Sequence, residues 1–266
     1  METQVITEHA VQSTDGTSIG YRTLGSGSPI VLVHGSISTG EQWLPVAGQL
    51  AASHTVYIMD RRGRGLSADA AEYSLDTESD DIKAVLAVAG EGSALLGHSY
   101  GAICALEAVR TGASVSSLVL YEPPLPVDAP TAGAALGLYA AAVEAGDGDK
   151  AMRVAAEHFL RISPEDTEAL ASSPLWAGMV ALSPTWTREL AEIDKTDVLV
   201  QRYSETDVPT LLLVGEVSPV HLVGASRHLR DRLANGTENV FPGQNHFAHV
   251  IDPVSVAEAI NAFLPR

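Results

Sequence analysis

A serine placed between two glycines is the feature of this sequence best suited to chemistry. It lies in Gly97-His98-Ser99-Tyr100-Gly101, after a short apolar run and before an alanine-rich segment with helical spacing. A strand that turns sharply into a helix with serine at the bend presents the hydroxyl for attack, an arrangement called a nucleophile elbow. The glycines are needed because a Cβ at either position would crowd the helix against the strand. The pattern predicts that Ser99 is a nucleophile.

A second Gly-x-Ser-x-Gly match, at residues 16–20, shows that the string alone is not specific. This match follows a turn signal at residues 13–16 and precedes an extended run at residues 21–24. No predicted strand leads into it and no predicted helix leaves it, so the mechanics of an elbow are missing. The context therefore selects Ser99 and excludes Ser18.

A serine hydroxyl is a poor nucleophile, and it needs a base that removes its proton. Two histidines, His246 and His249, follow the predicted strand at residues 237–241 and are the candidates for this base. The other histidines are interpreted as local hydrogen-bonding, surface or structural residues.

The elements that must position these residues alternate between strand and helix. A hairpin start is expected over residues 1–28, around the turn at Asp15 and Gly16. Continuous apolar runs predict strands covered on both faces, at residues 29–33, 55–59, 94–96, 115–121, 209–214 and 237–241. Helical periodicity is found from residue 38 or 39 to residue 50, and at residues 75–90, 220–233 and 253–264.

Between the strands at 115–121 and 209–214, only helical patterns are found, at residues 131–145, 149–162, 164–172 and 184–203. Strand–helix alternation on both sides of this stretch predicts an α/β fold, a mostly parallel sheet with a helical insertion. The expected domains are a core, residues 1–124 and 207–266, and a helical cap, residues 125–206.

Ligands of such sheets bind beyond the carboxyl ends of the strands. Residues with polar side chains follow the predicted strand ends, and we expect them to share one rim: His34, Asp60, Ser99, Glu122, Glu216 and His246.

Length and composition limit the function classes. A chain of 266 residues with 45% hydrophobic residues can form one α/β core with an insertion. A formal net charge of −17 disfavours nucleic acid as a partner. No apolar window of 18 residues predicts a membrane span, and the polar, acidic segment at residues 1–12 is unlike a signal peptide. We therefore expect a cytoplasmic protein that acts on a small molecule, while the oligomeric state stays open.

Metal and phosphate chemistry is not expected. The single cysteine, Cys104, excludes an internal disulfide and a cysteine-based metal site, and the histidines lack paired ligand spacing. Three arginines follow the strand at residues 55–59, but no Gly-Lys-Ser/Thr follows, which excludes a P-loop. Arg61, Arg62 and Arg64 are expected to hold a loop by bonds to backbone carbonyls and carboxylates.

Four segments together resemble the α/β-hydrolase superfamily, with a cap domain inserted. They are His34-Gly35 after a strand, the Asp60-to-Ser67 turn (Asp-Arg-Arg-Gly-Arg-Gly-Leu-Ser), the elbow around Ser99, and the Pro242-to-His249 loop (Pro-Gly-Gln-Asn-His-Phe-Ala-His). They occur in the family's order and cover the core, about residues 17–124 and 207–266. Their joint occurrence is far more specific than any one motif.

The resemblance implies roles for individual residues. Ser99 is the expected nucleophile, and His246 is the expected base, favoured over His249 because the Pro-Gly-Gln-Asn-His spacing matches the family. The oxyanion hole is expected from two backbone N–H groups, those of Tyr100 and Ser36, with Ile37 as the alternative to Ser36.

The third member of the triad departs from the commoner pattern of the family. Many relatives carry the acid three residues after the glycine that ends the strand before the last, and that position is Ser218 here. A serine cannot stabilise a charged imidazolium as a carboxylate does. A subset of the family carries the acid one strand earlier, where this chain has Glu122. Glu122 is the predicted partner of His246, Glu216 is the second candidate, and an incomplete triad remains open.

The function implied is that of a serine hydrolase that cleaves a carboxylic ester or a related acyl bond, such as a thioester or lactone, through an acyl-enzyme on Ser99. No metal or organic cofactor is expected, and the substrate is expected to be an apolar acyl compound. Apolar side chains of the cap either line an acyl pocket or pack the cap onto the core: Leu136, Leu138, Tyr139, Phe159, Leu175, Trp176, Met179 and Trp186.

Two other functions stay open. The same frame supports a carbon–carbon bond hydrolase or a cofactor-free haloperoxidase-like enzyme, and a homologue without activity would only bind a ligand. Serine at the elbow argues against haloalkane dehalogenases and epoxide hydrolases, whose nucleophile there is aspartate.

Overall fold

The computed structural model describes residues 5–265, apart from the side chain of residue 198, so residues 1–4 and 266 of the expected core lie outside it. In the described chain, eight strands form one sheet in the order β1-β2-β4-β3-β5-β6-β7-β8. Strand β2 pairs antiparallel with β1 and with β4, and the other neighbours are parallel. The strands are β1 (Thr7–Gln12), β2 (Ser18–Gly25), β3 (Ser28–Val33), β4 (His54–Met59), β5 (Ala94–His98), β6 (Ser117–Tyr121), β7 (Thr210–Gly215) and β8 (Gly236–Phe241). The predicted, mostly parallel sheet is confirmed.

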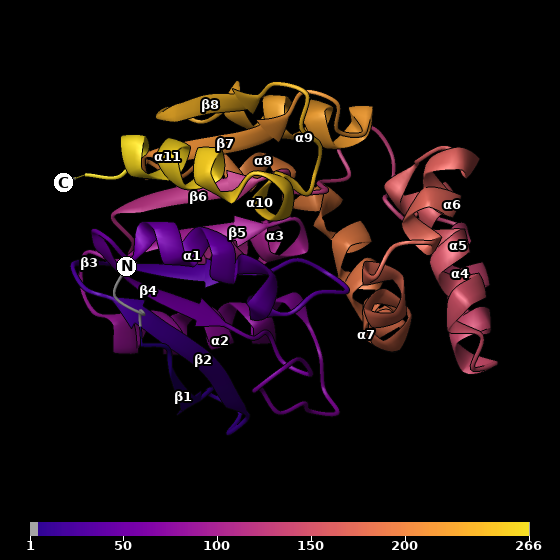
Figure 1. Cartoon of the computed structure of the whole chain (residues 1–266), viewed down its shortest axis with the longest axis horizontal. Helices are drawn as coiled ribbons and strands as arrows, with labels where there is room; N and C mark the ends of the chain where they lie inside the picture. The colour runs from indigo at the N-terminus through magenta and orange to yellow at the C-terminus, as the bar shows by residue number, and fades with distance from the viewer. Residues whose placement is uncertain (1–4, 266) are drawn as a thin grey trace.

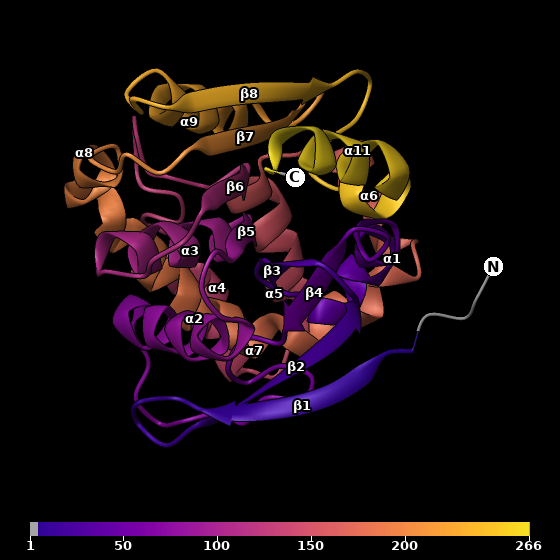
Figure 2. The ribbon, with the colours of Figure 1, turned by 90° about the vertical axis from the view of Figure 1, so that its left-hand side faces the viewer.

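Helices cover both faces of the sheet, which explains why the central strands are apolar throughout. In β3, Ile30 and Leu32 face the core cluster on one side, and Val31 and Val33 face the cluster on the other. One face carries α1 (Leu44–Leu50) and α11 (Pro253–Phe263). The opposite face carries α2 (Leu75–Ala89), α3 (Tyr100–Arg110) and α9 (Val220–Arg230), as Figure 2 shows. Short turns, η1 (Gly40–Trp43) and α10 (Ala248–Ile251), precede α1 and α11.

Local sequence sets the ends of these helices, as α2 shows. The Ser74 hydroxyl accepts a hydrogen bond from the Thr77 N–H (3.2 Å), and the Thr77 hydroxyl accepts one from the Ser74 N–H (3.1 Å). This reciprocal capping box satisfies two backbone donors at the start of the helix. Gly90, with φ of 95°, ends the helix in a conformation that glycine adopts without strain.

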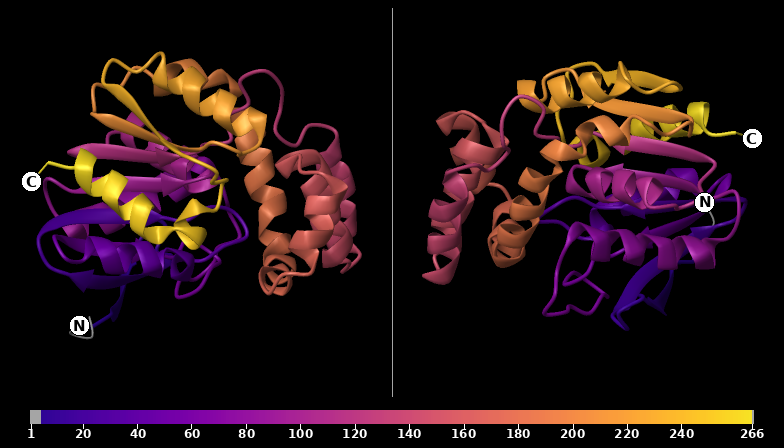
Figure 3. Two further views of the ribbon diagram at one scale, coloured as in Figure 1. Left: turned by 45° about the horizontal axis from the view of Figure 1, so that its top comes forward. Right: turned by 180° about the vertical axis from the view of Figure 1, so that it is seen from behind.

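The segment between β6 and β7 is helical, as expected, and contains no strand within its described residues. It comprises α4 (Ala135–Glu144), α5 (Gly148–Ala155), η2 (Ala156–Leu160), α6 (Pro164–Ala171), α7 (Leu175–Asp194), η3 (Lys195–Val198) and α8 (Val200–Tyr203). We call α4 to α8 the inserted helices. Helices α4 to α7 lie together to one side of the sheet, away from both chain termini (Figures 1 and 3).

The prediction that a helix begins at Pro184 is wrong. Pro184 lies inside α7, a helix of 20 residues. Proline lacks the N–H that would bond to the carbonyl four residues earlier, which is that of Val180. The Ser183 hydroxyl donates to this carbonyl instead, at 2.8 Å, and the Tyr139 hydroxyl donates to the Ser183 carbonyl at 2.7 Å. The Ser183 hydroxyl thus takes the place of the donor that the proline removes, and the helix continues through Pro184.

This substitution of partners is testable by a double-mutant cycle. We expect Ser183→Ala to lower the free energy of unfolding by about 1–3 kcal/mol, because the Val180 carbonyl loses its donor. In a Pro184→Ala background, the restored N–H should reduce this loss to less than about 1 kcal/mol. Urea denaturation of the four proteins measures both values. An equal loss in both backgrounds would contradict this account of α7.

Candidate active site

Ser99 lies at a strained bend between β5 and α3. Its backbone has φ of 54° and ψ of −124°, a combination that costs a residue other than glycine about 1–3 kcal/mol. Two backbone hydrogen bonds hold the bend: the Ser99 N–H donates to the Tyr121 carbonyl at 2.8 Å, and the Ser99 carbonyl accepts from the Ala102 N–H at 2.9 Å. The strain therefore persists because the neighbouring strand and the helix both fix the bend.

The flanking glycines have the steric role expected from the sequence. A Cβ on Gly97 would lie 2.4 Å from the Gly101 carbonyl oxygen, and one on Gly101 would lie 2.4 Å from the His34 carbonyl oxygen. Neither backbone atom can move away without distorting the strand or the helix. Ser18, in the rejected match, is instead the first residue of strand β2.

His246 is hydrogen-bonded to Glu122. The Nδ1 of His246 lies 2.6 Å from Oε2 of Glu122, and the carboxylate is completely buried. The other oxygen, Oε1, accepts the N–H of Gly215 at 2.7 Å, so both oxygens are held. A carboxylate only accepts, so the proton of this hydrogen bond lies on Nδ1 of His246, and in the neutral imidazole Nε2 is then the acceptor. The structure thus brings together the expected base and the expected acid.

Tyr121, which the sequence analysis missed, fixes the loop that carries His246. Its hydroxyl donates to the Asn245 carbonyl (2.5 Å) and accepts from the Ala248 N–H (3.0 Å). Nε2 of His98 also lies 3.1 Å from the carbonyl oxygen of His246. A buried tyrosine hydroxyl beside Glu122 at a strand end was the available signal, since buried phenols need partners.

The competing candidates lie elsewhere. His249 is fully buried, stacks on Trp43 with ring centroids 4.6 Å apart, and contacts the Gln42 side chain at 3.4 Å. Burial and then the neighbouring His246 lower the pKa of His249 to about 3, so it stays neutral. Glu216 is exposed and accepts the Gly243 N–H at 2.8 Å. Neither residue belongs to the pair described above.

Asp60, another residue at a strand end, holds loops. Asp60 is buried and accepts bonds from the N–H groups of Gly40 (2.7 Å) and Leu66 (2.9 Å) and from the Arg22 guanidinium (2.8 Å). The nearby arginines bond to carboxylates, as expected: Arg62, for example, binds Asp81 at 2.7 and 2.8 Å.

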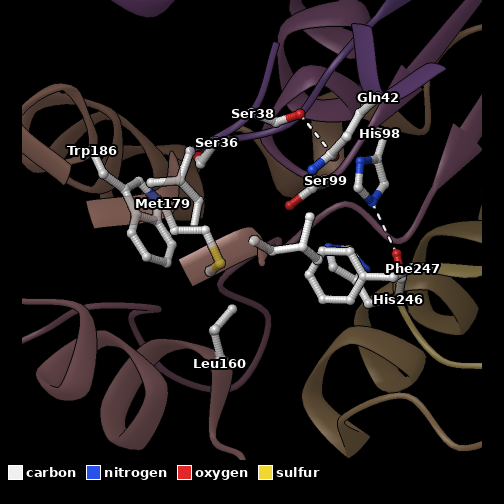
Figure 4. Close-up of a pocket in the computed structure, with 12 residues that line it drawn as sticks. Ser36, Ser38, Gln42, His98, Ser99, Leu160, Met179, Trp186, His246 and Phe247 are labelled. Atoms are coloured by element: carbon white, nitrogen blue, oxygen red, sulfur yellow. Dashed lines mark hydrogen bonds between the residues drawn. The ribbon is translucent and has the colours of Figure 1, made fainter. Parts of the chain in front are cut away.

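Ser99 and His246 line two small cavities beneath the inserted helices. One has a volume of about 40 Å³ and the other about 30 Å³, and Ser36 lines both. Figure 4 shows Trp186, Met179 and Leu160 across the first cavity from His98 and His246. The site therefore combines one polar wall, which carries Ser99 and His246, with an apolar wall.

The eight apolar side chains of the inserted helices divide between the two roles left open for them, apart from the exposed Leu138. Leu175, Met179 and Trp186 line the first cavity, and Phe159 and Trp186 line the second. The other four residues line neither cavity. Leu138 is 60% exposed, Leu136 packs against the main core cluster, Tyr139 bonds to Ser183, and Trp176 bonds to Asp149 at 2.9 Å. The sequence analysis left both roles open because helical periodicity does not distinguish a cavity wall from packing among helices.

Of the two expected oxyanion donors, Ser36 lines both cavities, and Tyr100 directly follows Ser99 in the chain. Gly35 lies so close to Ser99 that an added Cβ would be 2.9 Å from the Ser99 Cβ, and the next residue is Ser36. Within residues 5–265, the N–H groups of Ser36 and Tyr100 donate no hydrogen bond. Tyr100 begins α3, where the first backbone N–H groups have no partner inside the helix. Ile37, the alternative donor, has φ of 45°.

In the described part of the chain, no three metal-ligating side chains form a group that could hold an ion. Over the same residues, every helix is too short or too polar to cross a lipid bilayer.

The Tyr121 hydroxyl offers a test of how the His246 loop is held. We expect Tyr121→Phe to lower the free energy of unfolding by about 1–3 kcal/mol, because a buried carbonyl and a buried N–H lose their shared partner. Tyr57→Phe is the control, since the Tyr57 hydroxyl has no hydrogen bond within the described residues. Guanidinium denaturation compares the two, and equal effects would count against this role of Tyr121.

Solved structures with the same fold cover nearly the whole chain. An α/β hydrolase from Sphaerobacter thermophilus superposes with a TM-score of 0.89 at 29% identity, covering 97% of this chain and 100% of that chain. An esterase from Rhodococcus sp. ECU1013 superposes with a TM-score of 0.76 at 25% identity, covering 97% and 98%.

Curated relatives match over a shorter stretch. An N-formylmaleamate deformylase of Pseudomonas putida is 40% identical over 105 residues, which is 38% of this chain and 39% of that protein. A pimeloyl-[acyl-carrier protein] methyl ester esterase of Aliivibrio salmonicida is 36% identical over 104 residues, 39% of each. This chain thus aligns with about two fifths of the length of these relatives. Residues 30–259 match the model of the alpha/beta hydrolase family, well over half of the sequence. The chain therefore belongs to the α/β-hydrolase family.

Proposed function

We propose that this α/β hydrolase cleaves a carboxylic ester or a related acyl bond through an acyl-enzyme on Ser99. The main support is the 2.6 Å hydrogen bond between His246 and Glu122. The His246 imidazole lines the same cavities as the strained Ser99. A nucleophile, a base and an acid that orients the base form the constellation that activates a serine hydroxyl.

In the proposed reaction, the Ser99 Oγ attacks the substrate carbonyl carbon while Nε2 of His246 takes the hydroxyl proton. Glu122 stabilises the resulting imidazolium, and the N–H groups of Ser36 and Tyr100 stabilise the negative oxygen. The tetrahedral intermediate collapses, and His246 returns the proton to the leaving alcohol. Water then attacks the acyl group with His246 as base, and this second addition releases the acid and restores Ser99.

We also propose that residues 125–206 act as a cap over a core formed by residues 1–124 and 207–266. Side chains of α7 and η2 form the apolar wall opposite Ser99, which supports this division. An apolar lid excludes water from the acyl group and strengthens the electrostatic interactions beneath it.

The names of the relatives agree with acyl transfer. A methyl ester esterase and a deformylase are among the curated relatives, and an esterase is among the solved structures. The paired His246 and Glu122 argue against the alternative of a homologue that only binds a ligand, because such a protein has no need of a held base.

Loss of the nucleophile tests the proposal. Ser99→Ala should abolish hydrolysis of p-nitrophenyl acetate and labelling by a fluorophosphonate probe, whereas Glu122→Gln should lower kcat by about 10³-fold to 10⁴-fold, because the imidazolium loses its anion. Thermal unfolding checks that both variants are folded. A wild-type protein that neither hydrolyses the ester nor reacts with the probe would overturn the proposal.

The cavity volume predicts the acyl length. A cavity of about 40 Å³ is much smaller than the roughly 150 Å³ that holds benzene. We expect kcat/KM for p-nitrophenyl acetate to exceed that for the octanoate by at least about 10-fold, since a long chain must displace packed side chains at a cost of about 1–3 kcal/mol. Met179→Ala should narrow this ratio, and an unchanged ratio would show that the acyl chain does not occupy this cavity.

A further inference from the structure

The peptide group between Gly35 and Ser36 is held from its carbonyl side by two buried side chains. The Gly35 carbonyl oxygen lies 2.8 Å from Nδ1 of His34 and accepts a bond from Nη1 of Arg61 at 3.1 Å. A peptide group is planar, and in its trans form the carbonyl and the N–H point in opposite directions. These two bonds therefore aim the N–H of Ser36, which is the oxyanion donor of the proposed function.

The structure defines which nitrogen of His34 donates. The backbone N–H of Arg61 donates to Nε2 of His34 at 3.0 Å, so Nε2 is an acceptor and Nδ1 carries the proton. Burial, and then the charges of Arg61 and Arg64, hold the pKa of His34 well below its usual range. His34 thus stays neutral and keeps the tautomer that donates to the Gly35 carbonyl.

Arg61 brings a fixed positive charge to this peptide. Its guanidinium is completely buried, bonds to Glu78 through Nε (3.1 Å) and Nη2 (2.7 Å), and lies 4.6 Å from the centre of the Tyr100 ring. The fork bound to Glu78 leaves Nη1 directed at the Gly35 carbonyl. A cation on a carbonyl oxygen polarises the peptide, which makes its N–H a stronger donor.

The other anion beside Arg61 comes from the inserted helices. Oε1 of Glu189, on α7, accepts bonds from Nη2 of Arg61 (2.6 Å) and Nη2 of Arg64 (2.5 Å). Glu189 is fully buried, and although burial opposes it, the two guanidinium charges lower the pKa of this carboxyl. Removing one member of such a buried set leaves an uncompensated charge and disturbs the rest.

We propose that Glu189 and Arg61 are positioning residues for the oxyanion hole. Glu189 holds Arg61, Arg61 holds and polarises the Gly35–Ser36 peptide, and the packing of α7 on the core thereby completes the site that stabilises the negative oxygen. The inference rests on the proposed function for the reaction but concerns residues that touch neither the substrate nor Ser99.

Kinetics provide the first test. In Glu189→Gln, kcat for p-nitrophenyl acetate should fall about 10-fold to 100-fold with KM changed less than about 3-fold, because the oxyanion forms only on the way to the transition state. This loss is smaller than the 10²-fold to 10³-fold loss of a donor itself. Glu192→Gln is the matched control, since Glu192 on the same helix accepts the Leu75 N–H at 3.1 Å and has no bond to Arg61. It should change kcat less than about 2-fold.

A transition-state analogue separates positioning from a general loss of packing. A trifluoromethyl ketone forms an adduct with serine that places an oxyanion in the hole, so its inhibition constant should rise by the same factor as kcat/KM falls. A fall in kcat with unchanged inhibition by the ketone would overturn the proposal. If Glu189→Gln does not fold, Arg61→Lys carries the same test, because it keeps the charge but cannot bind Glu78, Glu189 and Gly35 together.

A measurement on the free protein keeps this inference separate from the proposed function. In ¹⁵N-labelled protein, the Ser36 amide signal should move in Glu189→Gln and in Arg61→Lys and stay in place in Glu192→Gln. An unmoved signal in the folded variants overturns the inference even if the enzyme is active. A moved signal in a protein without esterase activity or probe labelling supports the positioning and overturns only the proposed reaction.

Discussion

The rest of this structure depends on one buried carboxylate, that of Glu122. Its two oxygens bind Nδ1 of His246 and the N–H of Gly215, while its own backbone continues directly from β6 with φ of 45°. One residue therefore connects the carboxyl ends of β6 and β7 with the loop that follows β8, the next strand of the sheet. A buried charge is costly unless it is paired and hydrogen-bonded, and here each oxygen has a short contact with a donor. The geometry of the imidazole follows from this requirement.

A second set of buried charges links the inserted helices to the sheet. Arg61 and Arg64 share the carboxylate of Glu189, and Arg61 also binds Glu78. Replacing such a set by apolar residues is often neutral for stability, so its value lies in geometry more than in free energy. Glu189 on α7 contacts both arginines of the core, so these ion pairs tie α7 to the loop that follows β4.

Much of the fold could be predicted because its signals are local. Apolar runs predicted the buried strands, and the glycines beside Ser99 predicted a contact that leaves no room for a Cβ. Glu122 was predicted from its place after a strand together with the family resemblance, and the structure places it against His246. The failures involve side-chain hydrogen bonds and ion pairs that apolar patterns do not reveal. The continuation of α7 through Pro184 depends on the Ser183 hydroxyl, which periodicity does not reveal. The Arg61–Glu189 pair joins residues 128 positions apart, and no local sequence pattern predicts it.

Because the carboxylate comes from β6, the turn that follows β7 carries none of the groups assigned to the reaction. Its Val217 is 61% exposed, and Val220, at the start of α9, is 86% exposed. Among the described residues, this turn reaches the Glu122 side chain through the N–H of Gly215, and a backbone group does not depend on residue identity. A cysteine for a dye or a tether to a solid support can therefore be placed at the exposed Val217, which supplies no side chain to the proposed reaction.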